Sequence, residues 1–166
     1  MEQLSETEEN REVLHKGKYL TFLLNKEVYG IDIEHVTEII GMQTITCLPE
    51  LPPYMKGVIN LRGKIIPVMD VRLRFYKDSK EYDHRTCIIV ISILEISFGL
   101  IVDSVSEVVV ILDQDIVQLP EINKVSNKFI KGIGKINHEV KLLLDCEKLL
   151  NHTDLEQLNN TMEELK

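Results

Sequence analysis

The hydrophobic residues of this chain fall in short, β-prone runs that polar or glycine-containing turns separate. The run at 18–24 is followed by a polar turn and a second run at 28–33, which predicts an antiparallel hairpin. The same pattern returns at 86–94 and 96–102. The sequence therefore predicts that each half of the chain opens with a two-stranded hairpin.

The segments that follow the two hairpins, 33–40 and 102–109, share a further pattern. Their apolar spacing is compatible with a helical turn. Their β-branched residues favour a strand instead. We expect a short turn or bend at 34–36 and then a strand.

Prolines and glycines mark the rest of the first half. The segment 48–54 contains three prolines, which predicts an irregular extended connection. Arg62-Gly63 predicts a tight turn between strands at 58–61 and 65–69. Pro67 lies inside the second of these strands and predicts an edge position or a bulge.

The pattern repeats because the sequence itself repeats. Residues 29–40 recur as 98–109, offset by 69 positions, and ten of the twelve pairs are identical or conservative. Asp70 and Asp145 occupy equivalent places, and each is expected to cap a short helix. A fixed self-similarity of this kind indicates one small unit that is used twice.

Each unit has about five short strands, which can hide their edges only by curling into a small barrel. The first copy spans about 17–80 and the second about 84–150, with the boundary in the polar segment 77–85. A unit of this size is barely stable alone. The expected fold is all-β with short helices: two pseudo-symmetric five-stranded barrels packed together, with a groove between them.

The two ends of the chain have a different character. Residues 1–15 are polar and acidic and are expected to be a disordered tail, which leaves 16–152 as the folded domain. Residues 153–166 begin with a capping box and predict an amphipathic helix. Its apolar stripe consists of Leu155, Leu158, Met162 and Leu165. A helix this short must pack on something to be stable, and a helix packed on its own barrel or a frayed tail is favoured over a helix that binds a partner.

The charge limits the range of partners. The formal net charge is −8, which argues against a general affinity for nucleic acid or anionic lipid. The hydrophobic run 87–112 is interrupted by Glu95, Asp103 and Glu107, so no membrane-spanning segment is expected. The N-terminus lacks the apolar stretch of a signal peptide. We expect a cytoplasmic protein that does not insert into the membrane.

The chain lacks the side-chain constellations of an enzyme. No hydrolase elbow, phosphate-binding loop or dinucleotide fingerprint is present. The five histidines are scattered, and Cys47, Cys87 and Cys146 are not at metal-ligand spacing, so no metal or cofactor is expected. Glu38 and Glu107 are a repeated carboxylate pair without a nucleophile or base beside them. We therefore expect a protein that is not an enzyme.

The clearest difference between the copies is the turn Asn-Leu-Arg-Gly at 60–63, which the second copy lacks at the equivalent place in 132–145. An arginine at a hairpin tip presents a rigid fork of donors, suited to a carboxylate or to helix carbonyls of a partner. A solvated turn arginine is the alternative. Arg62 is therefore a candidate recognition residue.

The stretch 48–72, which reads Leu-Pro-x-x-Pro and later Lys-Gly-Val-Ile-Asn-Leu-Arg-Gly-x-Ile-Ile-Pro-Val-x-Asp-Val-Arg, resembles the CheW-type chemotaxis coupling proteins. So do Tyr29-Gly-Ile-x-Ile and Phe98-Gly-Leu-Ile-Val-Asp-x-Val, and the resemblance covers about 17–150. It implies two interlocked, Src-homology-3-like barrels. It also implies a largely monomeric, non-catalytic adaptor that joins the regulatory domain of the CheA histidine kinase to the cytoplasmic tips of chemoreceptors in membrane-associated arrays.

The resemblance also implies two binding surfaces. The receptor-binding residues would be Val36, Glu38, Ile39, Gly57, Val58, Asn60, Leu61, Arg62 and Val108. The kinase-binding residues would lie on strand edges and loops of the second barrel, at Gly99, Leu100, Val102, Gly132, Ile133 and Ile136. The alternative function is a generic small-molecule-sensing or peptide-binding β-barrel module. Peptide binding of the proline-rich kind would need an aromatic groove, and the chain has no Trp.

Overall fold

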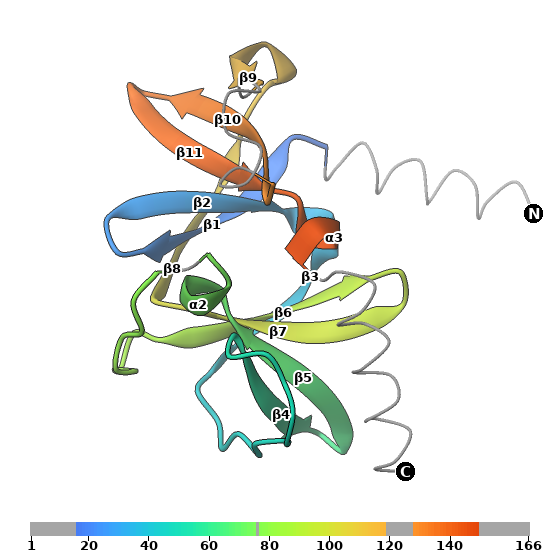
Figure 1. The fold of residues 1–166 in the computed structure, drawn as a ribbon. Coiled ribbons are helices and arrows are strands. Elements are labelled where there is room, and N and C mark those ends of the chain that lie inside the picture. The colour runs from blue at the N-terminus through green and yellow to red at the C-terminus, as the bar shows by residue number, and fades with distance from the viewer. Residues whose placement is uncertain (1–15, 76, 119–127, 150–166) are drawn as a thin grey trace, which may run out of the picture.

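The computed structural model describes residues 16–75, 77–118 and 128–149, and Figure 1 shows two β-sheets stacked one above the other. The six-stranded sheet has the order β8-β1-β2-β11-β10-β9, and the five-stranded sheet has the order β3-β6-β7-β5-β4. The strands are β1 (Lys18–Leu24), β2 (Glu27–Asp32), β3 (Val36–Gly41), β4 (Met55–Leu61), β5 (Lys64–Asp70), β6 (Cys87–Ile93), β7 (Ile96–Val102), β8 (Ser104–Val110), β9 (Ile116–Val117), β10 (Ile130–Ile136) and β11 (Glu139–Leu144). The short helices are η1 (Ile33–His35), α2 (Val71–Arg74), η2 (Asp113–Asp115) and α3 (Cys146–Leu149). The expected acidic tail at 1–15 and helix at 153–166 lie outside the described residues.

The elements that depend on local sequence are where the pattern predicts them. The hairpins β1–β2 and β6–β7 open the two halves, and both are antiparallel. The bend expected at 34–36 is the turn η1, and strand β3 follows it directly. Residues 48–54 form turns without a strand. The prediction of a mostly β fold with few short helices is confirmed.

The two halves of the chain exchange strands. Strand β8, from the second half, pairs with β1, so that Val109 faces Tyr19. Strand β3, from the first half, pairs with β6, so that Ile39 faces Ile89. The expectation that each copy, about 17–80 and about 84–150, builds one unit by itself is therefore corrected. Each sheet contains strands from both copies. The two halves are interlocked in this sense, as the family resemblance implies.

Equivalent backbone contacts recur in the two copies. The Asp70 N–H donates to the Tyr54 carbonyl at 2.7 Å, and the Asp145 N–H donates to the Phe129 carbonyl at 2.8 Å. The Asp70 carboxylate caps α2 as predicted, accepting from the Leu73 N–H at 3.3 Å. At α3 it is the main-chain carbonyl of Asp145 that accepts from the Lys148 N–H, at 3.2 Å. The sequence repeat is thus a repeat of structure, with local differences.

Pro67 is inside the five-stranded sheet, because β5 lies between β7 and β4. The expected edge position is wrong, and the register shift of this strand pair is in β4, between Met55 and Gly57, rather than at Pro67. Val58, which faces Pro67, uses both of its backbone groups on Thr46, at 2.8 and 2.9 Å. Proline is tolerated at position 67 because the Val58 carbonyl does not need a hydrogen bond from a backbone N–H at that position.

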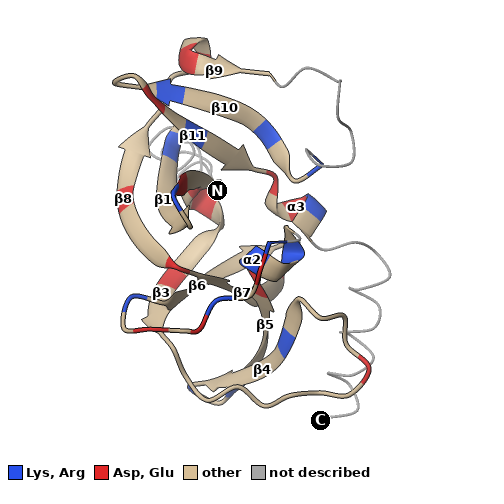
Figure 2. Ribbon diagram, turned by 60° about the vertical axis from the view of Figure 1, so that its left-hand side comes forward, with Lys and Arg blue, Asp and Glu red and all other residues tan. Residues whose placement is uncertain are grey.

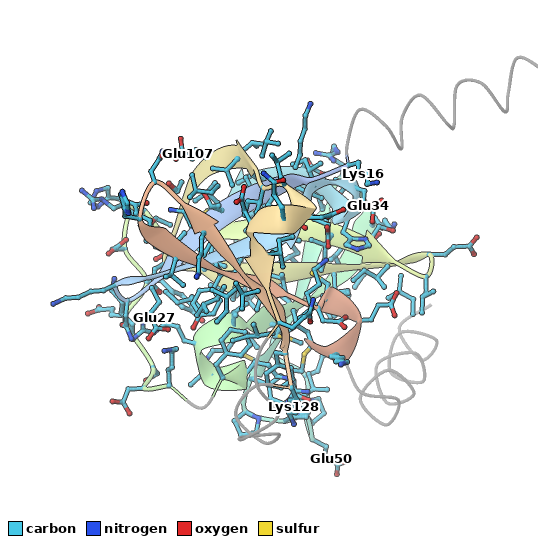
Figure 3. The ribbon with its side chains drawn as sticks, turned by 90° about the horizontal axis from the view of Figure 1, so that it is seen from above. Lys16, Glu27, Glu34, Glu50, Glu107 and Lys128 are labelled. Atoms are coloured by element: carbon cyan, nitrogen blue, oxygen red, sulfur yellow. The ribbon has the colours of Figure 1, made fainter. Side chains whose placement is uncertain are left out.

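One hydrophobic core joins the two sheets. It contains Phe22 and Ile31 from the six-stranded sheet and Ile91 and Leu100 from the five-stranded sheet, all fully buried. We call this cluster, which also includes Leu20, Ile89 and Val102, the shared core. A second cluster, which includes Val90, belongs to the five-stranded sheet alone. Charged side chains such as the labelled Glu50 and Glu107 lie at the periphery (Figure 3). The sheets are held together mainly by burial of aliphatic surface, as the composition predicts.

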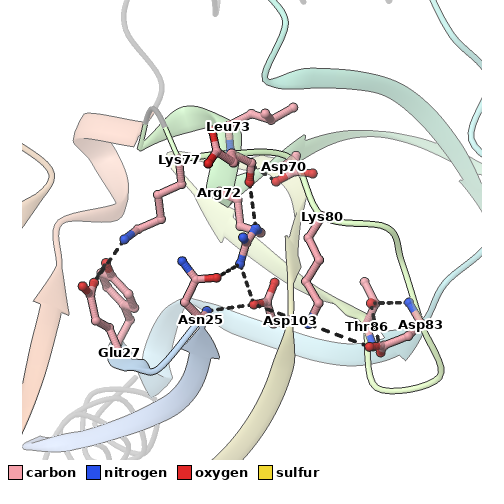
Figure 4. Close-up of polar contacts among 12 residues, drawn as sticks. Asn25, Glu27, Asp70, Arg72, Leu73, Lys77, Lys80, Asp83, Thr86 and Asp103 are labelled. Carbon is pink, nitrogen blue, oxygen red and sulfur yellow. Dashed lines mark hydrogen bonds and ion pairs between the residues drawn. The ribbon is translucent and has the colours of Figure 1, made fainter.

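A buried polar cluster ties the linker between the halves to both of them (Figure 4). The Arg72 guanidinium donates to the carboxylate of Asp103 at 2.8 Å and to the side-chain oxygen of Asn25 at 2.6 Å. Its Nε donates to the carbonyl of Asp78 in the linker at 3.1 Å. The Tyr82 hydroxyl donates to Asp70 at 2.7 Å. The linker is therefore part of the folded structure.

Candidate partner-binding surfaces

The tip of the β4–β5 hairpin presents Arg62 to solvent. Arg62 and Gly63 both have positive φ, 53° and 88°, as the mirror-image turns of tight hairpins require. The Asn60 side-chain oxygen accepts from the Gly63 N–H at 2.8 Å and fixes the turn. The Arg62 side chain is 70% exposed. The predicted arginine tip is thus present and accessible.

The Arg62 guanidinium is paired with Glu38 on β3, Nη2 donating to Oε1. This bond raises the pKa of Arg62 above its ordinary value. Strands β3 and β4 are the two edges of the five-stranded sheet, so the pair brings opposite edges together. Since a guanidinium has five N–H donors, most of them remain available to a partner.

Two edge strands carry exposed apolar residues at equivalent positions of the repeat. Ile39 on β3 faces Ile89, and Val108 on β8 faces Leu20. Directly opposed residues point to the same face of a sheet, and Ile89 and Leu20 belong to the shared core. Ile39 and Val108 therefore point to the side where the sheets meet, yet they are 46% and 52% exposed. Figure 2 shows β3 and β8 on the same side of the molecule.

The sequence prediction missed one residue of this region. Val36 is half-buried against the shared core, as is Val105, its counterpart 69 positions later. The repeat offset that links Ile39 to Val108 also links Val36 to Val105, so this signal could have found Val105. We define the junction surface as Val36, Glu38, Ile39, Asn60, Arg62, Val105 and Val108.

Three of the residues expected at the receptor surface are buried. Val58 is buried, and Leu61 belongs to the core of the five-stranded sheet. Gly57 has φ +142°, and a Cβ there would lie 2.1 Å from the carbonyl oxygen of Thr46. Its close backbone approach is therefore to its own chain. These residues support the hairpin from within, and their expected role in receptor binding stays a prediction.

Three of the six expected kinase contacts lie on β7, and all three are buried. Strand β7 lies between β6 and β5 and so has no free edge. A Cβ at Gly99 would lie 2.6 Å from Ile88, and Leu100 and Val102 belong to the shared core. The expectation that Gly99, Leu100 and Val102 form an accessible edge is wrong, because their neighbours in the sheet come from both halves of the chain.

The remaining kinase candidates lie on β10, beside the short strand β9. The pairing of β10 with β9 comprises only Ile133 and Gly134. Ile133 and Ile136 are half-buried, whereas Gly132 is buried. Among the described residues, the outer edge of β10 is therefore covered over a short stretch only.

The described part of the chain contains no group of three or more His, Cys, Asp and Glu residues that could hold a metal ion. Within the same residues, no helix has the length and apolar character needed to span a membrane.

Burial raises the pKa of the Cys146 thiol to about 12.

Comparison with known proteins gives a consistent result. A family model described as a CheW-like domain matches residues 18–154. The chain is 35% identical to a chemotaxis protein CheW of Klebsiella aerogenes over 86% of this chain and 87% of that protein. It is 33% identical to a chemotaxis protein CheW of Bacillus subtilis, over 81% and 86% of the two chains. The crystal structure of a scaffolding protein, TtCheW, from Thermoanaerobacter tengcongensis is similar with a TM-score of 0.77 and 36% identity, covering 83% of this chain and 94% of that one.

Proposed function

Since the chain belongs to the CheW-like family of chemotaxis scaffold proteins, we propose that it is a non-catalytic adaptor that couples the cytoplasmic tips of chemoreceptors to the CheA histidine kinase. An adaptor needs two different surfaces, and two diverged copies of one unit can supply them. The proposed place of action is the cytoplasmic face of receptor arrays, to which a monomer would be recruited.

The receptor would bind the junction surface. The single observation that carries this proposal is the exposure of Ile39 and Val108, at equivalent repeat positions, on the side where the sheets meet. Aliphatic side chains in this arrangement suit the apolar ridge of a helical partner. Arg62 is exposed beside them in the first copy, whereas Asn137 occupies the equivalent turn of the second. This asymmetry would fix the orientation of the bound helix.

The kinase regulatory domain would bind on the side of β10, through Ile133 and Ile136. The support is the limited coverage of this strand by β9 and the partial exposure of the two isoleucines. Both proposed surfaces are modest in extent, and weak contacts joined in one assembly gain strength through effective concentration.

Co-elution tests this function directly. The full chain is run on a sizing column with the CheA kinase, with a receptor-tip fragment, and with both together. We expect a complex with each partner alone and a larger one with both. A chain that associates with neither partner would overturn the proposal.

A further inference from the structure

Strands β2 and β11 are parallel neighbours that separate at their N-terminal ends. Their pairing comprises Tyr29 with Leu142 and Gly30 with Leu143. Continued in the same register, the pairing would bring the residues before Tyr29 against those before Leu142. Instead the strands diverge (Figure 1), and a cleft of about 510 Å³, lined by residues 26–28 and 139–142, lies between them. We call it the β2–β11 cleft.

The walls of this cleft are strand backbone over an apolar floor. Val28 and Leu142 are half-buried there, and Val140 is 54% exposed. Alternate residues of a strand direct their N–H and C=O groups to the same edge, so each diverging strand presents such groups to the cleft. Backbone groups of this kind seek hydrogen-bond partners, and a further extended chain supplies both donors and acceptors.

The charges around the cleft favour an acidic occupant. The Glu27 carboxylate accepts from the Tyr29 hydroxyl at 2.7 Å and from Lys77 at 3.2 Å. The Glu139 carboxylate accepts from Lys141 at 2.8 Å, and the Lys141 side chain is almost fully buried. Lys26 is exposed and has no ion pair among the described residues. The Glu27 and Glu139 carboxylates are thus each paired with a lysine, and the positive charge of Lys26 is not balanced by an ion pair among the described residues.

We propose that the β2–β11 cleft binds an extended, acidic segment of a partner protein by strand addition. The backbone of the segment continues the sheet between the two strands, its apolar side chains cover Val28 and Val140, and a carboxylate reaches Lys26. Strand addition gains affinity from main-chain hydrogen bonds and specificity from alternate side chains. The cleft uses no residue of the junction surface and neither Ile133 nor Ile136, so it is a third contact, independent of the proposed coupling function.

A peptide library tests this without receptor or kinase. Random dodecapeptides displayed on phage are selected on the full chain, and the dissociation constants of enriched peptides are measured by fluorescence anisotropy. We expect sequences in which carboxylates alternate with β-branched residues. Val140→Asp and Lys26→Glu should each weaken binding by about tenfold or more. The matched controls are Val110→Asp, at a similarly exposed valine on β8, and Lys16→Glu, at an exposed lysine, and both should bind as the parent does.

Two further measurements address the mode of binding. N-methylation of alternate peptide nitrogens should abolish binding, because it removes main-chain donors. Bound peptide should slow amide hydrogen exchange at 26–29 and 139–142. The proposal is overturned if no peptide is enriched, if Val140→Asp binds as well as the parent, or if N-methylated peptides bind unchanged.

Discussion

Arg62 and Glu38 lie at opposite edges of the five-stranded sheet, 24 positions apart in the sequence, and their side chains form an ion pair. The pair holds the tip of the β4–β5 hairpin beside β3. It thereby places a guanidinium next to Ile39, at the border of the junction surface. Because the Arg62 side chain is exposed, the pair contributes little to stability and is better suited to positioning.

Arg62→Glu should abolish binding of a receptor-tip fragment and leave the melting temperature close to that of the parent. The guanidinium is exposed, so the fold does not depend on it, whereas the substitution puts two carboxylates side by side at the proposed surface. Isothermal titration and thermal melting measure the two effects. The double exchange Arg62→Glu with Glu38→Arg restores the pair and should still fail to bind. Unchanged binding of the single variant would remove Arg62 from the surface.

Gly57→Ala should destabilise the fold by about 2–4 kcal/mol. The added Cβ would meet the carbonyl oxygen of Thr46 at 2.1 Å, and the positive φ of Gly57 disfavours any side chain. Urea unfolding measures the change. Gly41→Ala is the matched control, because nothing lies within 4 Å of its Cβ position, and it should change stability by less than about 0.5 kcal/mol. Equal effects of the two substitutions would contradict the close approach.

Arg72→Met should cost about 3 kcal/mol of stability, because it leaves the buried carboxylate of Asp103 without its main partner. Both side chains of this pair are about nine-tenths buried. The control is Lys80→Met, which removes an exposed ammonium 4.0 Å from the same carboxylate and should cost less than about 1 kcal/mol. Urea unfolding of both variants gives the comparison, and a larger effect at Lys80 would be inconsistent with the structure.

Glu27 should titrate below its ordinary value of 4.5, because the Tyr29 hydroxyl and then Lys77 stabilise its ionised form. A lowered folded-state pKa stabilises the fold above the ordinary carboxyl pKa, and this contribution is lost as the pH falls through the folded value. Tyr29→Phe removes the main cause and should raise the pKa of Glu27. A carbon-detected NMR titration of the carboxyl group measures it, and an unchanged pKa in the variant would exclude the hydroxyl as the cause.

The three cysteines should react in the order Cys47, Cys87, Cys146. Cys47 is exposed, and Cys87 is half-buried with a raised pKa. Cys146 is buried and has a pKa of about 12, so little thiolate is present at pH 8. Alkylation of the native protein with iodoacetamide, followed by mass spectrometry, gives the order. Cys146 should react at the rate of Cys47 only after unfolding.

Local structure followed from the sequence because its causes are local. The hairpin β1–β2, the bend before β3 and the turn at Arg62 are each set by neighbouring residues. The exchange of strands could not be predicted in this way. The two copies have similar alternation, so the pattern of β3 is equally compatible with pairing to β1 or to β6. That choice depends on contacts between residues far apart in the chain.

The residues expected at the candidate surfaces also fall into two groups, those that the structure exposes and those that it buries. Ile39 and Val108 were assigned to the receptor surface through the family resemblance, and both are exposed. The close approach that Gly57 permits is to Thr46 of its own chain, and the sequence could not show this, since a glycine indicates a close approach without indicating to what. Gly99 was expected at a strand edge, but β7 lies between β6 and β5. The sequence could not show this, because the neighbours of β7 depend on how the two halves of the chain combine.

The exchange of strands also sets an order of events during synthesis. When the ribosome has released β1 and β2, this hairpin still lacks both of its outer neighbours, β8 and β11. The first neighbour is complete only at Val110 and the second at Leu144. The nascent chain therefore carries a hairpin with two open edges until β8 is complete and with one open edge until β11 is complete, and this is the stage at which a chaperone would protect it.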